Sequence, residues 1–316
     1  MMINEKKAYY FYQVLTLALM KKNVTSARIK KVLLTPAAGS QSFDLKHANL
    51  LLSQQLPSAD LLSNKNWDDA RWFHEKNKSY GVSMRCINDP RYPNYLRIIK
   101  DAPPMLFVRG NKDIFDTLPG VAIVGAREAT DAGKEIARRV AKYLAENDWA
   151  VVSGLALGID AAAHRGCLEV QGKTIAILAG GLDKPSPATN ADLGFQILES
   201  GGAWISEHPV GVPPKKHHFV PRNRIQVGLS AGSIIIEAKI KSGSLTQAKF
   251  CVDQNRPLFA VVPHQIHNPL SLNSEGTMHM VNDLNATAIS TKADYQKIIE
   301  KLSLTKKHLE DYQLKI

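Results

Sequence analysis

Short apolar runs alternate with helix-compatible segments from residue 121 to residue 262. Runs of strand length occur at 121–125, 149–153, 174–180, 203–207, 233–238 and 258–262. Because these runs are short and lack polar alternation, they are typical of strands that helices cover on both faces. Strand–helix units joined by right-handed crossovers build a doubly wound sheet. The pattern therefore predicts an α/β fold with a mostly parallel sheet, whose ligands bind beyond the carboxyl ends of the strands.

The two ends of the chain have a different pattern. Apolar residues recur at helical spacing at 4–21, 25–35, 43–54 and 67–79, which predicts a small helical N-terminal domain over 1–80. Residues 81–120 are rich in proline, which demands turns and extended backbone, and we assign them as a connector within an α/β domain at 81–290. The remaining residues, 291–316, are predicted to form a tail of one or two short polar helices.

Composition narrows the class of protein. The 316 residues carry a formal net charge of +11, which is typical of a protein with a polyanionic partner or of a merely basic surface. The apolar run near the N-terminus is short and broken by polar residues, so it predicts an amphipathic helix and neither a signal peptide nor a membrane span. The three cysteines lack disulfide or zinc spacing, which indicates core residues, no metal site and a cytoplasmic protein.

Small and basic residues follow several of the predicted strands, where they would meet at one edge of the sheet. GAR follows the first strand, SGLALG ends the second, and KSGS follows the fifth, while PRNR lies between the fourth and fifth. Helix N-termini and arginine side chains at such an edge suit phosphate groups. The ligand could be a dinucleotide, a small phosphorylated metabolite or a nucleic-acid backbone, and the glycines could instead serve only close helix packing.

Two nucleotide-binding motifs are missing. The first strand is followed by GARE, without the second glycine of the dinucleotide motif G-x-G-x-x-G, so NAD binding is disfavoured. No G-x-x-x-x-G-K-[ST] loop is present, which disfavours an ATPase. We therefore expect no cofactor.

Six motifs in one order carry a resemblance to a known family. They are VAIVGAR, VVSGLALGIDAAAHRG, TIAILAGGLD, ISEHPVGVPP, FVPRNRIQVGLS and IIIEAKIKSGSLTQAKF, with DPRYPNYLRIIKDAPPMLFVRGN ahead of them. Over residues 85–262 the chain resembles the DNA-processing protein A family. The resemblance implies an extended Rossmann-like fold and a cytoplasmic homodimer that binds single-stranded DNA without catalysis. Such a protein protects incoming DNA and helps to load the RecA recombinase onto it in natural transformation.

The resemblance also implies a set of DNA-binding residues. By motif these are Gly125, Arg127, Ser153, Gly154, Gly158, Arg222, Arg224, Lys241, Ser242, Gly243 and Ser244. The basic side chains would neutralise successive phosphates, and the glycines would admit the backbone. Single-strand sites usually add stacking platforms, and Phe219 beside PRNR is the aromatic best placed for this role.

Each of these residues has a plainer interpretation. Arg127 could pair with Asp160 or Glu237, for which we expect structural roles, and Arg224 could lie on a helix surface. Phe219 could instead lie in the core. Among the histidines, His164 is expected to be a packed helix residue, and the pair at 217–218 is expected to be loop surface without a metal.

The chain departs from the family pattern in two places. The loop after the last apolar run has His264 where the family has glycine, so no site residue is assigned over 263–282. The tail is too short for the C-terminal winged-helix domain that many members carry.

Two other functions remain open. One is a nucleoside-monophosphate phosphoribohydrolase of the related lysine-decarboxylase-like proteins, but their PGGxGTxxE motif is replaced here by KSGSLTQAK. The other is a nucleotide-sensing defence protein that uses the same edge of the sheet for a small ligand.

Overall fold

A computed structural model of the protein describes residues 2–35, 42–57, 61–265 and 267–313. One mixed sheet of nine strands runs through it in the order β1-β2-β6-β5-β4-β3-β7-β8-β9. The strands are β1 (Val82–Cys86), β2 (Met105–Gly110), β3 (Gly120–Gly125), β4 (Val151–Ser153), β5 (Thr174–Ile177), β6 (Ala203–Ser206), β7 (Ser230–Ile236), β8 (Leu258–Val261) and β9 (Thr287–Ile289). The strands from β6 to β9 in this order are parallel, whereas β2 pairs antiparallel with β6 and with β1. The α/β fold predicted from the sequence is confirmed.

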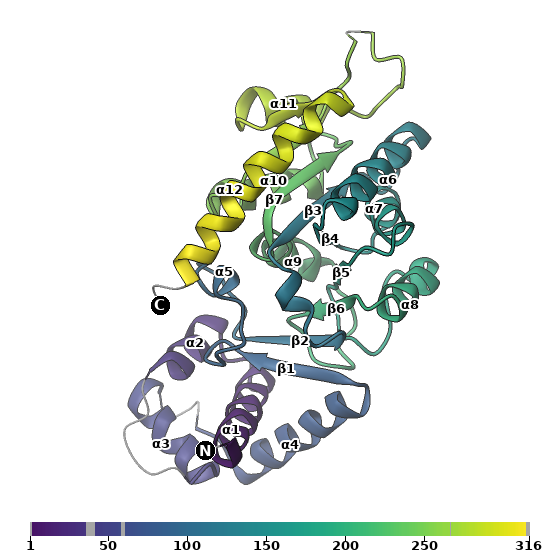
Figure 1. Ribbon diagram of the computed structural model, residues 1–316. Helices are drawn as coiled ribbons and strands as arrows, with labels where there is room; N and C mark the ends of the chain where they lie inside the picture. The colour runs from purple at the N-terminus through teal and green to yellow at the C-terminus, as the bar shows by residue number, and fades with distance from the viewer. Residues whose placement is uncertain (1, 36–41, 58–60, 266, 314–316) are drawn as a thin grey trace.

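Helices cover both faces of the parallel sheet (Figure 1). They are α5 (Asn94–Arg97), α6 (Asp131–Glu146), α7 (Ile159–Leu168), α8 (Ala191–Glu199), α9 (Lys216–Gly228), α10 (Gly243–Asp253), α11 (Glu275–Asp283) and α12 (Tyr295–Gln313), with 3-10 turns η2 (Ile114–Thr117), η3 (Ala188–Asn190) and η4 (Lys292–Asp294). Side chains of α6, α7 and α12 share one apolar cluster with β3 and β7. Those of α9, α10 and α11 share another on the opposite face, so the sheet is doubly wound.

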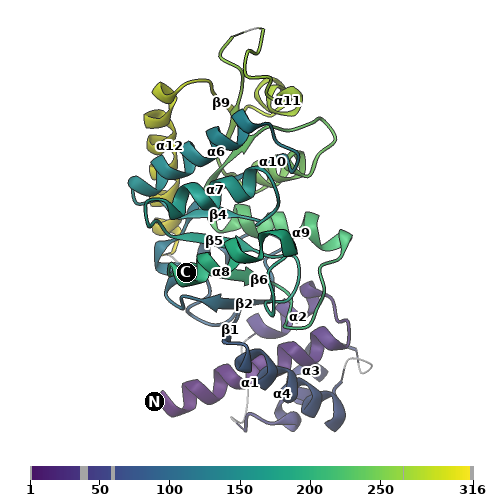
Figure 2. The same cartoon turned by 90° about the vertical axis from the view of Figure 1, so that its right-hand side faces the viewer.

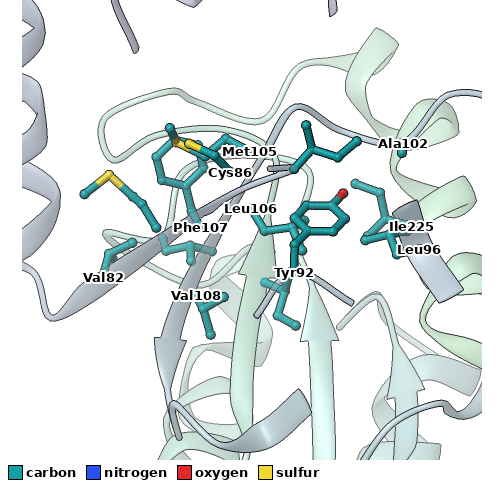
Figure 3. Packing of buried hydrophobic residues seen from close by; sticks show 14 of the residues in the cluster. Val82, Cys86, Tyr92, Leu96, Ala102, Met105, Leu106, Phe107, Val108 and Ile225 are labelled. Atoms are coloured by element: carbon teal, nitrogen blue, oxygen red, sulfur yellow. The ribbon is translucent and has the colours of Figure 1, made fainter. Parts of the chain in front are cut away.

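Four helices precede the sheet: α1 (Met2–Lys21), α2 (Ser26–Leu34), α3 (Leu45–Gln55) and α4 (Asn64–Ser79). The side chain of Asp44 accepts a hydrogen bond from the backbone of His47, and Ser63 forms a capping box with Asn66, so polar side chains define where α3 and α4 begin. The apolar faces of α1–α4 continue into the cluster around β1 and β2. Figure 3 shows part of this cluster, in which side chains of both strands pack beside Tyr92, Leu96 and Ile225.

All six apolar runs contain strands, and the suggested strand at 81–87 is β1. Two strands escaped prediction. Prolines at 103 and 104 hid β2, which begins directly after them, and β9 has only three residues. The division into domains after residues 80 and 290 stays a prediction.

Two helices contradict the expectations drawn from the sequence. His217 and His218 lie in the first turn of α9, so the loop predicted for them is wrong; prolines before the helix and Pro221 inside it weaken its signal. The tail predicted at 291–316 is helical, but it is neither short nor wholly polar. It is mainly α12, one helix of 19 residues that buries Ile298 and Leu302 against the sheet. Residues 314–316 of this tail lie outside the described residues.

Candidate nucleic-acid interface

A pocket of about 320 Å³ lies at the carboxyl end of β3, between α9 and the N-terminus of α10. Figure 2 shows α9 and α10 next to each other on one side of the sheet. Eight of the residues predicted from the sequence line this pocket: Gly125, Arg127, Phe219, Arg222, Lys241, Ser242, Gly243 and Ser244. The structure therefore brings together motifs that lie up to 119 positions apart, as expected when the carboxyl ends of parallel strands share one edge.

The loop after β3 forms one wall of the pocket. Two glycines let neighbouring backbone segments pack closely against this loop. A Cβ atom on Gly125 would collide with the backbone oxygen of Ile236, its partner in β7. Gly158 has a φ of +73° at the N-cap of α7, and a Cβ there would collide with the backbone oxygens of Ala126 and Arg127. Gly158 does not line the pocket, but its close approach supports the loop that presents Arg127.

Arg127 is exposed, and its guanidinium lies over the ring of Phe219 at 5.3 Å from the centroid. It forms no ion pair with any described residue. The alternative pairing with Glu237 is not observed, because that carboxylate accepts hydrogen bonds from Thr130 and from the backbone of Asn273. The guanidinium of Arg127 is therefore available to an anion.

Asp160 is not a partner of Arg127 either. Its carboxylate accepts backbone hydrogen bonds from Gly154, at 3.0 Å, and from Ala156, at 3.4 Å. Burial raises the pKa of Asp160, and the positive charge of Arg222 opposes this shift. Asp160 thus orders the turn after β4 and compensates a buried cation.

That cation is Arg222, which is 7% exposed and lies deep in the pocket. One guanidinium nitrogen donates to the backbone oxygen of Ile177, and Nε has no partner in the described structure. A Cβ atom on Gly154 would lie 2.6 Å from Cζ of Arg222, so the guanidinium rests directly on the backbone of this glycine. Burial lowers the pKa of Arg222 to about 10, and Asp160 opposes the shift.

The neighbouring Ser153 is fully buried and does not line the pocket. Its hydroxyl donates to the backbone oxygen of Ile123 at 2.6 Å, which ties β4 to β3. Ser153 and Gly154 therefore lie beneath the pocket and support it from below.

The N-terminus of α10 forms the opposite wall. Ser242 is the N-cap residue, and its hydroxyl is buried without a hydrogen-bond partner in the described structure. A Cβ atom on Gly243 would meet nothing within 4 Å, so this first turn is open to a ligand. Unpaired N–H groups and the helix dipole make such a terminus attractive to anions. Lys239 and Lys241 are exposed beside it and form no ion pair with the described residues.

Arg224 is not brought to the pocket. It is 8% exposed, and its guanidinium forms two hydrogen bonds with the carboxylate of Glu207, at 2.8 and 2.7 Å. Its Nε donates to the backbone oxygen of Asp101 at 2.7 Å. All three nitrogens are engaged by the protein, so the structure gives Arg224 a role in holding α9 to the loop after β6.

The sequence reasoning missed several polar residues of the pocket, among them Gln226 and Gln247, which are 1% and 0% exposed. In each, one amide atom is buried without a partner in the described structure. Gln226 follows Arg222 by four positions, which places both on one helix face, and this spacing was a usable signal. Lys239 precedes Lys241 by two positions and was not assigned to the site because it lies just outside the KSGS motif.

The histidines lie outside this pocket. His164 is fully buried in α7, as expected, with Nδ1 2.7 Å from the hydroxyl of Thr174, and burial lowers its pKa to about 3. His208 stacks on His218 at 4.1 Å between ring centroids, and burial lowers the pKa of His208 to about 4. In the described part of the chain, no group of three His, Cys, Asp or Glu side chains could hold a metal ion. No described helix is both long and apolar enough to cross a membrane.

The chain is similar to proteins of one known family. Residues 83–303 match the family model described as DNA recombination-mediator protein A. The chain is 40% identical over 192 residues to protein Smf of Synechocystis and 36% identical over 192 residues to the DNA processing protein DprA of Bacillus subtilis. These alignments cover 60% and 61% of the chain, but only 48% and 64% of the two relatives.

Two solved structures are also similar. DNA processing protein A from Streptococcus pneumoniae superposes with a TM-score of 0.74 and 32% identity, over 91% of this chain and 97% of the other. A structure of the Helicobacter pylori protein, described as giving insights into its single-stranded DNA binding mode, has a TM-score of 0.60 and 31% identity, over 70% of this chain and 95% of the other.

Proposed function

Because the chain belongs to the DNA recombination-mediator protein A family, we propose that it binds single-stranded DNA in the pocket at the carboxyl end of β3. One observation carries the proposal. Three exposed cations, Arg127, Lys239 and Lys241, surround the open N-terminus of α10, and none has a carboxylate partner among the described residues. Several cations around one helix N-terminus suit a chain of phosphates better than a single small anion.

Phe219 would act as a stacking platform for a base. Its ring is partly exposed at the mouth of the pocket and carries Arg127 on one face. Aromatic side chains beside cations are the usual means by which proteins hold single strands without reading their sequence. The single-stranded DNA binding mode described for the Helicobacter pylori protein supports the proposal that the ligand is a single strand.

We further propose that the protein acts as a homodimer without catalysis, in the processing of DNA for recombination and transformation, and that it passes the strand to RecA. The family supports this role. Binding without catalysis is supported by the buried carboxylate of the pocket, Asp160, which is already engaged by Arg222 and by backbone N–H groups.

Fluorescence anisotropy of a labelled oligonucleotide over a salt series tests the binding proposal. The affinity falls with salt, and each lost phosphate contact should make the negative slope of log affinity against log salt shallower by about 0.7. Arg127→Ala and Lys241→Ala should each weaken binding and reduce this slope. Lys307→Ala is the matched control, because Lys307 is an exposed cation on α12 outside the pocket. Binding that is absent, or insensitive to salt, would overturn the proposal.

The enzymatic alternative has its own readout. Release of free base from AMP by the purified protein would contradict the non-catalytic role and favour a phosphoribohydrolase. Tight binding of a mononucleotide, without binding of the oligonucleotide, would favour the nucleotide-sensing alternative.

A further inference from the structure

The N-terminal helices present a tryptophan to solvent. Trp72 on α4 is 58% exposed, although tryptophan is usually largely buried. Nζ of Lys76, one turn later, lies 5.0 Å from the centroid of its ring. Asp68, one turn earlier, pairs with Arg71, whereas Lys76 forms no ion pair with a described residue. Trp72 and Lys76 therefore form an exposed pair of aromatic ring and cation, like that of Phe219 and Arg127 at the pocket.

The loop between β6 and α9 connects this pair to the pocket. The backbone N–H of Val210 donates to Oδ1 of the fully buried Asn77 at 3.0 Å, which fixes the loop to α4. A Cβ atom on Gly211, where φ is +89°, would lie 3.4 Å from Nζ of Lys76. Figure 2 shows the segment before α9 reaching down to the N-terminal helices. The cation of Lys76 thus lies directly against the loop that leads into α9.

Only a short distance separates Gly211 from the start of α9. Five residues span at most about 17 Å, even when fully extended. Lys215 and Lys216 are exposed at the end of this span and form no ion pair within the described structure. Two carboxylates at this loop are engaged, since Asp183 accepts from the N–H of Gly211 and Glu207 pairs with Arg224.

We name the exposed and partly exposed side chains along this route the α4–α9 track. It consists of Trp72, Lys76, Lys215, Lys216, Phe219 and Arg127. It carries an aromatic ring at each end and positive charge between them, which is the composition that holds a nucleic-acid backbone together with stacked bases.

We propose that a single strand bound in the pocket continues along the α4–α9 track and stacks a base on Trp72. This inference rests on the proposed function and extends it, because it assigns the N-terminal helices a direct role in holding DNA. Stacking on one indole adds affinity without sequence preference, since every base has a π-face. The track predicts that affinity depends on strand length, because only a strand long enough to leave the pocket reaches α4.

Anisotropy with two oligothymidylates tests this inference, one of about 6 and one of about 20 nucleotides. Trp72→Ala should weaken binding of the long strand about five- to tenfold and leave the short strand unchanged. Trp72→Phe keeps an aromatic face and should retain most of the affinity, whereas Trp72→Leu should behave like the alanine variant. Lys76→Ala should lower the salt slope for the long strand only, by about 0.7, while Lys307→Ala should change neither strand.

Tryptophan fluorescence gives an independent readout. The long strand should quench emission of the wild-type protein, and Trp72→Phe should remove most of that quenching, since Trp149 and Trp204 are buried and Trp67 is partly buried against Phe11. Unchanged affinity of Trp72→Ala for the long strand, or equal weakening for both strands, would overturn the inference and leave the pocket proposal standing. If the wild-type protein binds neither strand, the proposed function fails as well.

Discussion

Arg224 offers a sharp test of how the structure assigns roles to two arginines of one motif. The sequence places it beside Arg222 in PRNR as a phosphate ligand, but the structure pairs it with Glu207. The two side chains are 10% and 17% exposed. We predict that Arg224→Met destabilises the protein strongly, because it leaves the carboxylate of Glu207 nearly buried without a cation.

The size of this effect follows from the burial of the pair. Removing one partner of a buried ion pair costs about 3–5 kcal/mol, and the residual exposure of both side chains places this pair near about 3 kcal/mol. The double variant Arg224→Met/Glu207→Gln removes both charges, so it should recover part of the loss. Urea unfolding measures the free energies of unfolding, and the double-mutant cycle isolates the coupling between the two side chains.

The pH dependence of this cost has a definite sign. Burial opposes ionisation of Glu207, but the hydrogen bonds and charge of Arg224 outweigh it and lower the pKa of Glu207. A lowered folded pKa stabilises the protein above the unfolded pKa, and this contribution is lost as the pH falls through the folded pKa. The deficit of Arg224→Met should therefore be largest near pH 7 and should shrink as the pH falls, first through the pKa of the unpaired Glu207, which burial raises in the variant, and then through the lowered pKa of Glu207 in the wild-type protein.

Arg127→Ala is the comparison that makes the test decisive. Arg127 is exposed, so its removal should change the free energy of unfolding by less than about 0.5 kcal/mol while it weakens DNA binding. The reasoning is refuted if Arg224→Met unfolds at the same urea concentration as the wild-type protein and loses DNA affinity as Arg127→Ala does.

Three further outcomes are expected. Gly154→Ala should push the guanidinium of Arg222 away from the backbone of residue 154, costing about 1–3 kcal/mol in urea unfolding and weakening DNA binding. The three cysteines are buried, and burial raises the pKa of each thiol to about 12, so a thiol reagent at pH 8 should label none of them until urea unfolds the protein. Burial lowers the pKa of His164 to about 3, so as the pH falls this imidazole is protonated in the unfolded state well before it is protonated in the folded state. The free energy of unfolding should therefore fall below about pH 6.5, by about 1.4 kcal/mol per pH unit from this residue. His164→Gln should flatten this slope, whereas the exposed His308→Gln should not.

The parallel sheet could be predicted because its strands have a strong local signal. Residues 121–125 and 234–236 are apolar without interruption, as strands covered on both faces require. The strand β2 was missed although residues 105–108 are apolar, because Pro103 and Pro104 directly before it are typical of a turn or connector. Its pairing could not be predicted either, since its partner β6 begins more than 90 residues later and no pattern within 105–110 encodes that partner.

The pocket could be predicted as far as topology determines it. Residues that follow β3 and β7 had to meet at one edge, and Arg127 and Lys241 do. The individual contacts of PRNR could not be predicted. Arg222 and Arg224 differ by two positions and lie on different sides of α9, so one turns toward Gly154 and the other toward Glu207. Which side faces the pocket depends on the packing of the whole helix.

The packing of α12 affects how this protein can be shortened. Ile298, Leu302 and Leu309 are 2%, 0% and 4% exposed, and a Cβ atom on Gly232 in β7 would lie 2.7 Å from a methyl carbon of Leu302. A version of the chain that ends at residue 290 would leave the centre of the sheet uncovered on one face and would aggregate. Shortened versions of the chain should therefore retain α12, which these side chains anchor to the rest of the protein.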